Sequence, residues 1–116
     1  MSSYVLIVDD NPSDLILTGA HLEKEGFISI KANNGFDALE LVNEFPFVLF
    51  IIDLQMPKMG GLELIKRIKS LATLKNIPIV VTSARKESKD VILAVQAGAN
   101  DYLVKPLDGM IFKEKV

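Results

Sequence analysis

Hydrophobic and polar positions divide the chain into short apolar runs, each followed by a stretch of mixed polarity. The run at 47–52 is almost unbroken and rich in aromatic and β-branched residues. Runs of this length and composition are typical of strands buried on both faces, as in the middle of a parallel sheet. The predicted strands are 4–8, 27–31, 47–52, 77–81 and 101–104, of which the second is the weakest.

The stretches between the runs predict helices, because apolar residues recur in them at three- and four-residue spacing. The first helix begins at 11–13, with a proline where its missing N–H is harmless, and ends at Gly26. A fourth helix is predicted over 86–97, and Asp108 caps a last one. The predicted apolar faces are Leu15, Ile16 and Leu22 in the first helix and Leu62, Ile65, Ile68 and Leu71 in the third, where Lys66, Arg67 and Lys69 are expected to face solvent.

Strand and helix alternate five times, which predicts a parallel sheet with helices on both faces. With 116 residues and no internal repeat, low-complexity segment or linker, the chain is expected to form one domain over 1–116. The predicted class is therefore α/β, a single doubly wound (βα)5 domain.

Composition and charge narrow the range of functions. The net charge is -2 and no basic stripe is present, which argues against direct nucleic-acid binding. The chain has no cysteine, so disulfides, thiolate metal sites and a cysteine nucleophile are excluded. The first ten residues lack the basic region of a signal peptide, and no apolar run approaches the roughly 20 residues of a membrane span. A soluble, cytoplasmic protein is expected.

Polar functional groups follow four of the five predicted strands. Asp9 and Asp10 follow the first, Asp53 the third, Thr82 the fourth and Lys105 the fifth. Because the carboxyl ends of parallel strands meet at one edge, where ligands bind in open α/β sheets, these groups are expected to converge. Burying a carboxylate directly after an apolar strand is costly unless something pairs with it.

The convergence predicts phosphoryl-transfer chemistry. Three carboxylates in one crevice repel one another unless cations compensate. Lys105 supplies one positive charge, and a hard divalent cation, Mg²⁺ with Mn²⁺ as a substitute, would supply the rest through oxygen ligands. An ionised carboxylate such as that of Asp53 can act as a nucleophile and form an aspartyl-phosphate. Thr82 and Lys105 would then hold the phosphoryl oxygens.

Each of these residues also has an ordinary structural interpretation when it is taken alone. An acidic pair before a helix complements the helix dipole, and a lone aspartate after a strand forms a turn. Thr82 could be a capping hydroxyl. Tyr102 reads as a partly buried strand aromatic and His21 as a surface or packing residue. These separate interpretations do not explain why all four sites fall at the same edge of the sheet.

The motifs at the strand ends resemble those of the receiver domain of two-component response regulators. They are VDD after the first strand, DLQMP with Gly61 after the third, VTSA after the fourth and GANDYLVKP at the fifth. The resemblance covers essentially the whole chain, and the motifs in this order are far more specific than any one of them. It implies a flavodoxin-like sheet in strand order 2-1-3-4-5.

The resemblance also implies roles for individual residues. Asp53 would be the phosphoacceptor, with Mg²⁺ held by Asp10 directly, by Asp9 through water and by the main-chain carbonyl of Gln55. Thr82 would donate a hydrogen bond to the phosphoryl group, and Lys105 would pair with it. The resemblance further implies that the Lys105–Pro106 peptide bond is cis. It also implies that Tyr102 is the aromatic residue that turns inward when Thr82 moves.

The implied function is that of a phosphoacceptor that assists its own phosphorylation and dephosphorylation and does not turn over external substrates. The phosphoryl donor would be a sensor histidine kinase or a phosphotransfer protein. The output surface would comprise the fourth helix, the fifth strand and the last helix. An output domain and a homodimer are both compatible with this surface.

Other functions with related folds fit the sequence less well. A phosphatase of the haloacid-dehalogenase type has a second aspartate where this chain has Gln55. A flavodoxin would need a phosphate-binding loop after the first strand, where this chain has the acidic DDNPSD, and the P-loop motif is absent. The alternative that remains is a phosphate-independent interaction module with the same fold, which no residue of the sequence favours.

Overall fold

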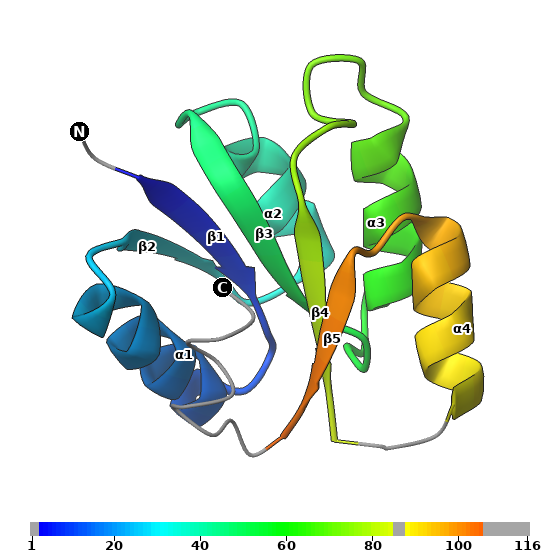
Figure 1. The fold of residues 1–116 in the computed structure, drawn as a ribbon, viewed down its shortest axis with the longest axis horizontal. Helices are drawn as coiled ribbons and strands as arrows, with labels where there is room; N and C mark the ends of the chain where they lie inside the picture. The colour runs from blue at the N-terminus through cyan, green and yellow to red at the C-terminus, as the bar shows by residue number, and fades with distance from the viewer. Residues whose placement is uncertain (1–2, 85–87, 106–116) are drawn as a thin grey trace.

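The strands of the computed structural model form one parallel sheet, in the order β2-β1-β3-β4-β5 (Figure 1). The structure describes residues 3–84 and 88–105. The predicted α/β class and strand order are confirmed. The strands are β1 (Tyr4–Val8), β2 (Ile28–Ala32), β3 (Phe47–Asp53), β4 (Ile79–Ser83) and β5 (Asp101–Val104).

Helices cover both faces of the sheet. The hydrophobic residues of α1 pack with one face, and those of α2, α3 and α4 pack with the other (Figure 1). The last predicted helix, with its cap Asp108, and the peptide bond before Pro106 lie outside the described residues. The helices are α1 (Pro12–Lys24), α2 (Gly35–Leu41), α3 (Gly61–Lys69) and α4 (Ser88–Ala97).

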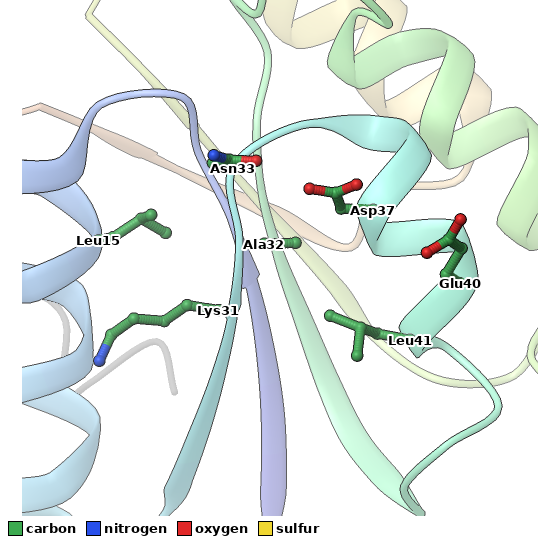
Figure 2. A pocket seen from close by; sticks show the side chains of 7 residues that line it. All are labelled: Leu15, Lys31, Ala32, Asn33, Asp37, Glu40 and Leu41. Carbon is green, nitrogen blue, oxygen red and sulfur yellow. The ribbon is translucent and has the colours of Figure 1, made fainter.

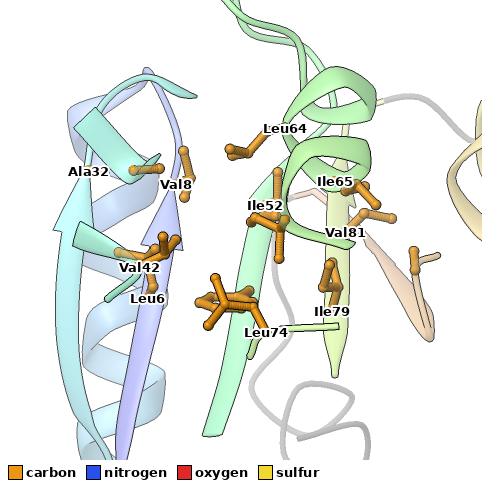
Figure 3. Close-up of a cluster of buried hydrophobic side chains, with 14 of the residues drawn as sticks. Leu6, Val8, Ala32, Val42, Ile52, Leu64, Ile65, Leu74, Ile79 and Val81 are labelled. Atoms are coloured by element: carbon orange, nitrogen blue, oxygen red, sulfur yellow. The ribbon is translucent and has the colours of Figure 1, made fainter. Parts of the chain in front are cut away.

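The core lies between the sheet and these helices because alternate strand residues point to opposite faces. In β1, Leu6 and Val8 join the cluster under α2, α3 and α4, whereas Val5 and Ile7 join the cluster under α1. Figure 3 shows the larger cluster, in which side chains from the strands meet Leu64 of α3. Each fully buried leucine or isoleucine stabilises the fold by about 1.5–3 kcal/mol, so this packing fixes the strand ends in place.

The prediction that Ile16 and Leu71 lie on buried apolar faces of their helices is wrong. Ile16 is 68% exposed, because α1 buries Leu15 and Leu22 on a stripe that does not include it. Leu71 is 38% exposed, since α3 ends at Lys69 and the helical period no longer applies beyond it. Leu64 takes its place in the core, so the buried stripe of α3 is Gly61, Leu64, Ile65 and Ile68.

The prediction that Lys69 faces solvent is wrong, because its side chain turns back onto the loop that follows α3. Its ammonium donates hydrogen bonds to the main-chain oxygens of Lys75 at 2.9 Å and Ile77 at 3.2 Å. Burial lowers the pKa of this ammonium. The side chain therefore closes the loop between α3 and β4.

The fourth strand lies two residues further along the chain than predicted. Pro78 precedes β4, where its missing N–H costs no ladder bond, and the side chain of Asn100 accepts a hydrogen bond from the Ile79 N–H at 2.9 Å. Thr82 and Ser83 are buried and extend the strand. This shift makes Thr82 part of the sheet, directly beside Asp53.

Candidate functional site

The carboxyl edge of the sheet brings together the polar groups that follow the strands, as predicted. Asp53 ends β3 and is paired in register with Thr82 of β4. Asp9 follows β1 and Lys105 follows β5. Asp9, Asp53 and Thr82 are each only 3% exposed, so two carboxylates and a hydroxyl are buried at this edge.

Three carboxylates form a group that could share a cation. Asp9, Asp10 and Asp53 each offer an oxygen atom, and these atoms lie within 4.8 Å of one another. Asp10 is exposed, which leaves the group open to solvent on one side. Hard oxygen ligands and an excess of negative charge suit Mg²⁺ or Mn²⁺, so the donor set fits the predicted metal.

The environment of Asp53 disfavours its charge. Burial and the neighbouring Asp9 carboxylate raise the pKa of Asp53 from 3.8 to about 6, and the Lys105 charge and the Gln55 N–H offset part of this effect. The Gln55 N–H donates to Asp53 Oδ1 at 3.2 Å, and the Asn11 N–H donates to Asp9 Oδ1 at 3.0 Å. A cation placed among these oxygens would favour the ionised, nucleophilic form of Asp53.

Lys105 pairs with three carboxylates: Asp9 after β1, Asp14 in α1 and Asp53 at the end of β3. Its Nζ lies 2.8 Å from Asp9 Oδ2, 2.9 Å from Asp14 Oδ2 and 3.5 Å from Asp53 Oδ2. Burial lowers the pKa of this ammonium, but the hydrogen bonds to Asp9 and Asp14 and the charges of Asp53 and Asp9 outweigh it, so that the pKa is raised. The ammonium therefore stays protonated at the edge of the sheet.

Asp14 was not predicted to belong to the site. It lies in the first turn of α1 and does not follow a strand, so the comparison of strand ends passes over it. Asn11 caps this helix and accepts hydrogen bonds from the N–H groups of Ser13 at 2.9 Å and Asp14 at 3.2 Å. The acidic character of the segment DDNPSD was the available signal, and its last aspartate accepts a hydrogen bond from Lys105 at 2.9 Å.

The loop between β3 and α3 packs tightly against the site. A Cβ atom on Gly61 would overlap the main-chain oxygen of Asp53 and lie 2.8 Å from Leu54 Cα. Met56 and Met59 are buried in the core, as expected for loop residues that pack. Glycine at 61 is therefore required by the close approach of two backbone segments.

The structure also places the other residues for which the sequence analysis considered a role. Gln55 is exposed, and its side chain accepts a hydrogen bond from the Ser83 hydroxyl at 3.1 Å. Tyr102 was predicted to be a partly buried aromatic residue of the strand, and 39% of it is exposed. His21 lies on α1 in a half-buried position. The metal role of the Gln55 carbonyl and the switch role of Tyr102 stay predictions.

A separate cavity of about 500 Å³ lies between α1 and α2, beside the end of β2 (Figure 2). Its lining includes Lys31 and Asn33 of the β2 segment and Asp37 and Glu40 of α2. Neither Asp53 nor Lys105 lines it. β2 therefore borders a different depression, and among the described residues it adds no functional side chain to the acidic site, as predicted; its Ala32 carbonyl only accepts a hydrogen bond from the Asp9 N–H at 3.1 Å.

Comparison with known proteins shows similarity to receiver domains along nearly the whole chain. The family model for the response regulator receiver domain matches residues 5–116. The transcriptional regulatory protein CpxR homolog of Haemophilus influenzae is 39% identical over 106 residues, which are 91% of this chain and 45% of that protein. Protein PilH of Pseudomonas aeruginosa is 32% identical over 104 residues, which are 90% of this chain and 86% of that protein.

The structure is similar to that of the chemotaxis protein CheY4 of Vibrio cholerae. The TM-score is 0.94 at 26% identity, with 99% of this chain and 96% of that chain covered. The chain spans less than half of the length of the CpxR homolog. Within the described residues, no helix combines the length and the apolar character that crossing a membrane requires. The chain belongs to the receiver domain family of two-component response regulators.

Proposed function

We propose that this receiver domain, spanning 1–116, accepts a phosphoryl group on the carboxylate of Asp53. The observation that carries the proposal is the position of Asp53. It is buried at the carboxyl edge of the sheet, its pKa is raised, and it lies within reach of Asp9, Asp10 and an ammonium. Structural cores rarely contain such an arrangement, and groups with strongly perturbed pKa values gather at functional sites.

The transfer step is a displacement at phosphorus. A carboxylate oxygen of Asp53 forms a bond to the phosphorus atom as the bond from phosphorus to the donor's imidazole nitrogen breaks, and the imidazole keeps the electron pair. A small acyl phosphate can serve as donor in the same way. Because the site only positions groups and neutralises charge, no further nucleophile or base is required.

Asp9, Asp10 and Asp53, with the main-chain carbonyl of Gln55, would hold Mg²⁺ or Mn²⁺. When bound, the ion offsets negative charge on the transferred phosphoryl oxygens. The Thr82 hydroxyl donates a hydrogen bond to one of these oxygens, and the Lys105 ammonium pairs with another. The buried positions of Asp9 and Thr82 support these roles, since Thr82 is the register partner of Asp53 and an Asp9 oxygen lies within 4.8 Å of one of Asp53.

Phosphorylation then shifts a two-state equilibrium that a partner reads. The phosphoryl group adds roughly one unit of net negative charge and new acceptor oxygens at Asp53, so Thr82 and Lys105 gain a ligand and the loops at the edge move. Tyr102 on β5 turns inward as Thr82 moves. The output surface comprises α4, β5 and the helix predicted from the sequence after β5, and the exposed apolar side chains of Ile92 and Val95 on α4 support this role.

The proposed donors are a sensor histidine kinase or a phosphotransfer protein in the cytoplasm. The surface on α4 and β5 would contact an output domain or a second copy of the chain. No direct contact with nucleic acid is expected, because the net charge is -2.

The proposal is tested by the intact mass of the protein after incubation with acetyl phosphate, with Mg²⁺ or with a chelator. One added phosphoryl group is expected in the wild type with Mg²⁺, and none in Asp53→Asn. Circular dichroism checks that the variant is folded. Absence of any added group in the folded wild type would favour the phosphate-independent interaction module.

A further inference from the structure

The Lys105 ammonium is already engaged by two carboxylates that do not accept phosphate. It donates hydrogen bonds to Asp9 at 2.8 Å and to Asp14 at 2.9 Å, while the nearest oxygen of Asp53 lies 3.5 Å away. An ammonium has three N–H donors, so these two bonds leave one for any new ligand. Because Asp9 and Asp14 hold the ammonium closer than Asp53 does, a phosphoryl group on Asp53 that draws Lys105 towards itself has to compete with these two carboxylates.

The two competing acids differ in their other surroundings. Asp9 belongs to the group of three carboxylates that could share a cation, so a metal ion would draw its charge away from Lys105. Asp14 does not belong to that group. Its side chain is 30% exposed and lies in the first turn of α1, where the helix dipole stabilises a negative charge. Asp14 is thus the acid that would still hold Lys105 once a metal is bound.

We propose that Asp14 is a positioning residue that competes with the phosphoryl group on Asp53 for the ammonium of Lys105. This inference rests on the proposed function. The pair holds Lys105 towards α1 in the resting domain, and the free energy needed to break it opposes phosphorylation. The strength of the pair sets how readily Lys105 reaches the phosphoryl group.

An ordinary role for Asp14 would be to complement the dipole of α1, and the chain contains a matched control for that role. Asp37 stands at the corresponding position of α2. Asn34 caps that helix and accepts a hydrogen bond from the Asp37 N–H at 2.8 Å, just as Asn11 does from Asp14 at 3.2 Å. The carboxylate of Asp37 accepts a hydrogen bond from the amide of Asn34, not from a lysine. Asp37→Asn therefore removes the same helix-end charge without touching Lys105.

The first test measures the affinity of the domain for trifluoroberyllate, a stable mimic of a phosphoryl group, in the presence of Mg²⁺. Asp14→Asn is expected to bind the mimic about three- to fivefold more tightly than the wild type, which is the upper part of the range for a partly exposed ion pair. Asp37→Asn should match the wild type within about twofold. Asp14→Glu keeps the charge and should stay closer to the wild type than Asp14→Asn does.

The same measurement in a Lys105→Gln background separates competition from a general change in charge. If Asp14 acts through Lys105, adding Asp14→Asn to Lys105→Gln should not change the affinity. A gain that persists without Lys105 would overturn the proposal. Unchanged or weaker binding in the single variant Asp14→Asn, while the wild type binds the mimic, would also overturn it.

A second readout needs no phosphoryl mimic. The rate at which the Lys105 side chain is acetylated by a small amine-reactive acetyl ester, followed by peptide mass spectrometry, reports how firmly its ammonium is held. This rate should rise about threefold or more in Asp14→Asn and stay unchanged in Asp37→Asn. An equal rate in all three proteins would contradict the proposed pairing. A wild type that fails to bind the mimic would instead contradict the proposed function, and the inference would fall with it.

Discussion

Asp53 and Thr82 are direct partners across β3 and β4, and both are buried at the carboxyl edge of the sheet. The main-chain oxygen of Thr82 also accepts a hydrogen bond from the Leu54 N–H at 3.0 Å. The loop that follows the proposed phosphoacceptor is therefore tied to the strand that carries the hydroxyl. Movement of Thr82 towards a phosphoryl group would be transmitted to both loops.

Replacement of Thr82 by alanine is expected to weaken binding of the phosphoryl mimic trifluoroberyllate about three- to tenfold, because one hydrogen bond of about 1 kcal/mol is lost. Thr82→Ser keeps the hydroxyl and should restore most of the affinity. Titration of both variants in the presence of Mg²⁺ measures this difference. Equal weakening in the two would mean that the methyl group, not the hydroxyl, matters.

The raised pKa of Asp53 predicts how the stability of the metal-free domain depends on pH. Between about pH 4 and 6 the unfolded chain releases this proton while the folded chain keeps it, so the free energy of unfolding falls as pH rises. The loss of stability caused by ionising the buried Asp53 is complete above about pH 6 and absent well below pH 4.

Asp53→Asn removes that loss of stability and should raise the free energy of unfolding by about 1–3 kcal/mol at pH 8, with the gain vanishing at low pH. Urea unfolding of both proteins across this range, with a chelator present, is the measurement. Added Mg²⁺ should stabilise the wild type more than the variant. A gain that does not change with pH would show that Asp53 is not the titrating group.

The close approach of Gly61 to the backbone of Asp53 predicts that Gly61→Ala lowers the free energy of unfolding by about 1–3 kcal/mol, since a Cβ atom forces the two segments apart. Gly60→Ala is the control, because no atom lies within 4 Å of the Cβ that it would add. Thermal or urea unfolding of the two variants compares them. Equal loss of stability at both positions would contradict the packing described for this loop.

The hydrogen bonds of Lys69 predict that Lys69→Met lowers the free energy of unfolding by about 1–2 kcal/mol, because two main-chain oxygens lose their charged donor. Lys66→Met, on an exposed position of the same helix, should change it by less than about 0.5 kcal/mol. Urea unfolding again provides the comparison. If the two variants are equally stable, the loop between α3 and β4 does not depend on Lys69.

The sequence predicts the sheet well, because short apolar runs such as 47–52, rich in aromatic and β-branched residues, are typical of strands buried on both faces. The same regularity predicts the meeting of Asp9, Asp53, Thr82 and Lys105, since parallel strands end at a common edge. Leu71 was misplaced because periodicity does not show where a helix ends. Lys69 and Asp14 were missed for a related reason. Lys105 lies 91 residues from Asp14 in the sequence, and the partners of Lys69 lie six and eight residues further on, in the loop before β4. Only the folded structure places a lysine next to loop carbonyls or a helix aspartate next to Lys105.

The most direct measurement is the identification of the phosphorylated residue. After incubation with acetyl phosphate and Mg²⁺, borohydride reduces an aspartyl-phosphate to homoserine, which peptide mass spectrometry locates. We predict homoserine at position 53, dependent on Mg²⁺ and absent from a chelator control. Homoserine at another aspartate such as Asp10, or modification that is equal with and without metal, would contradict the assignment of Asp53.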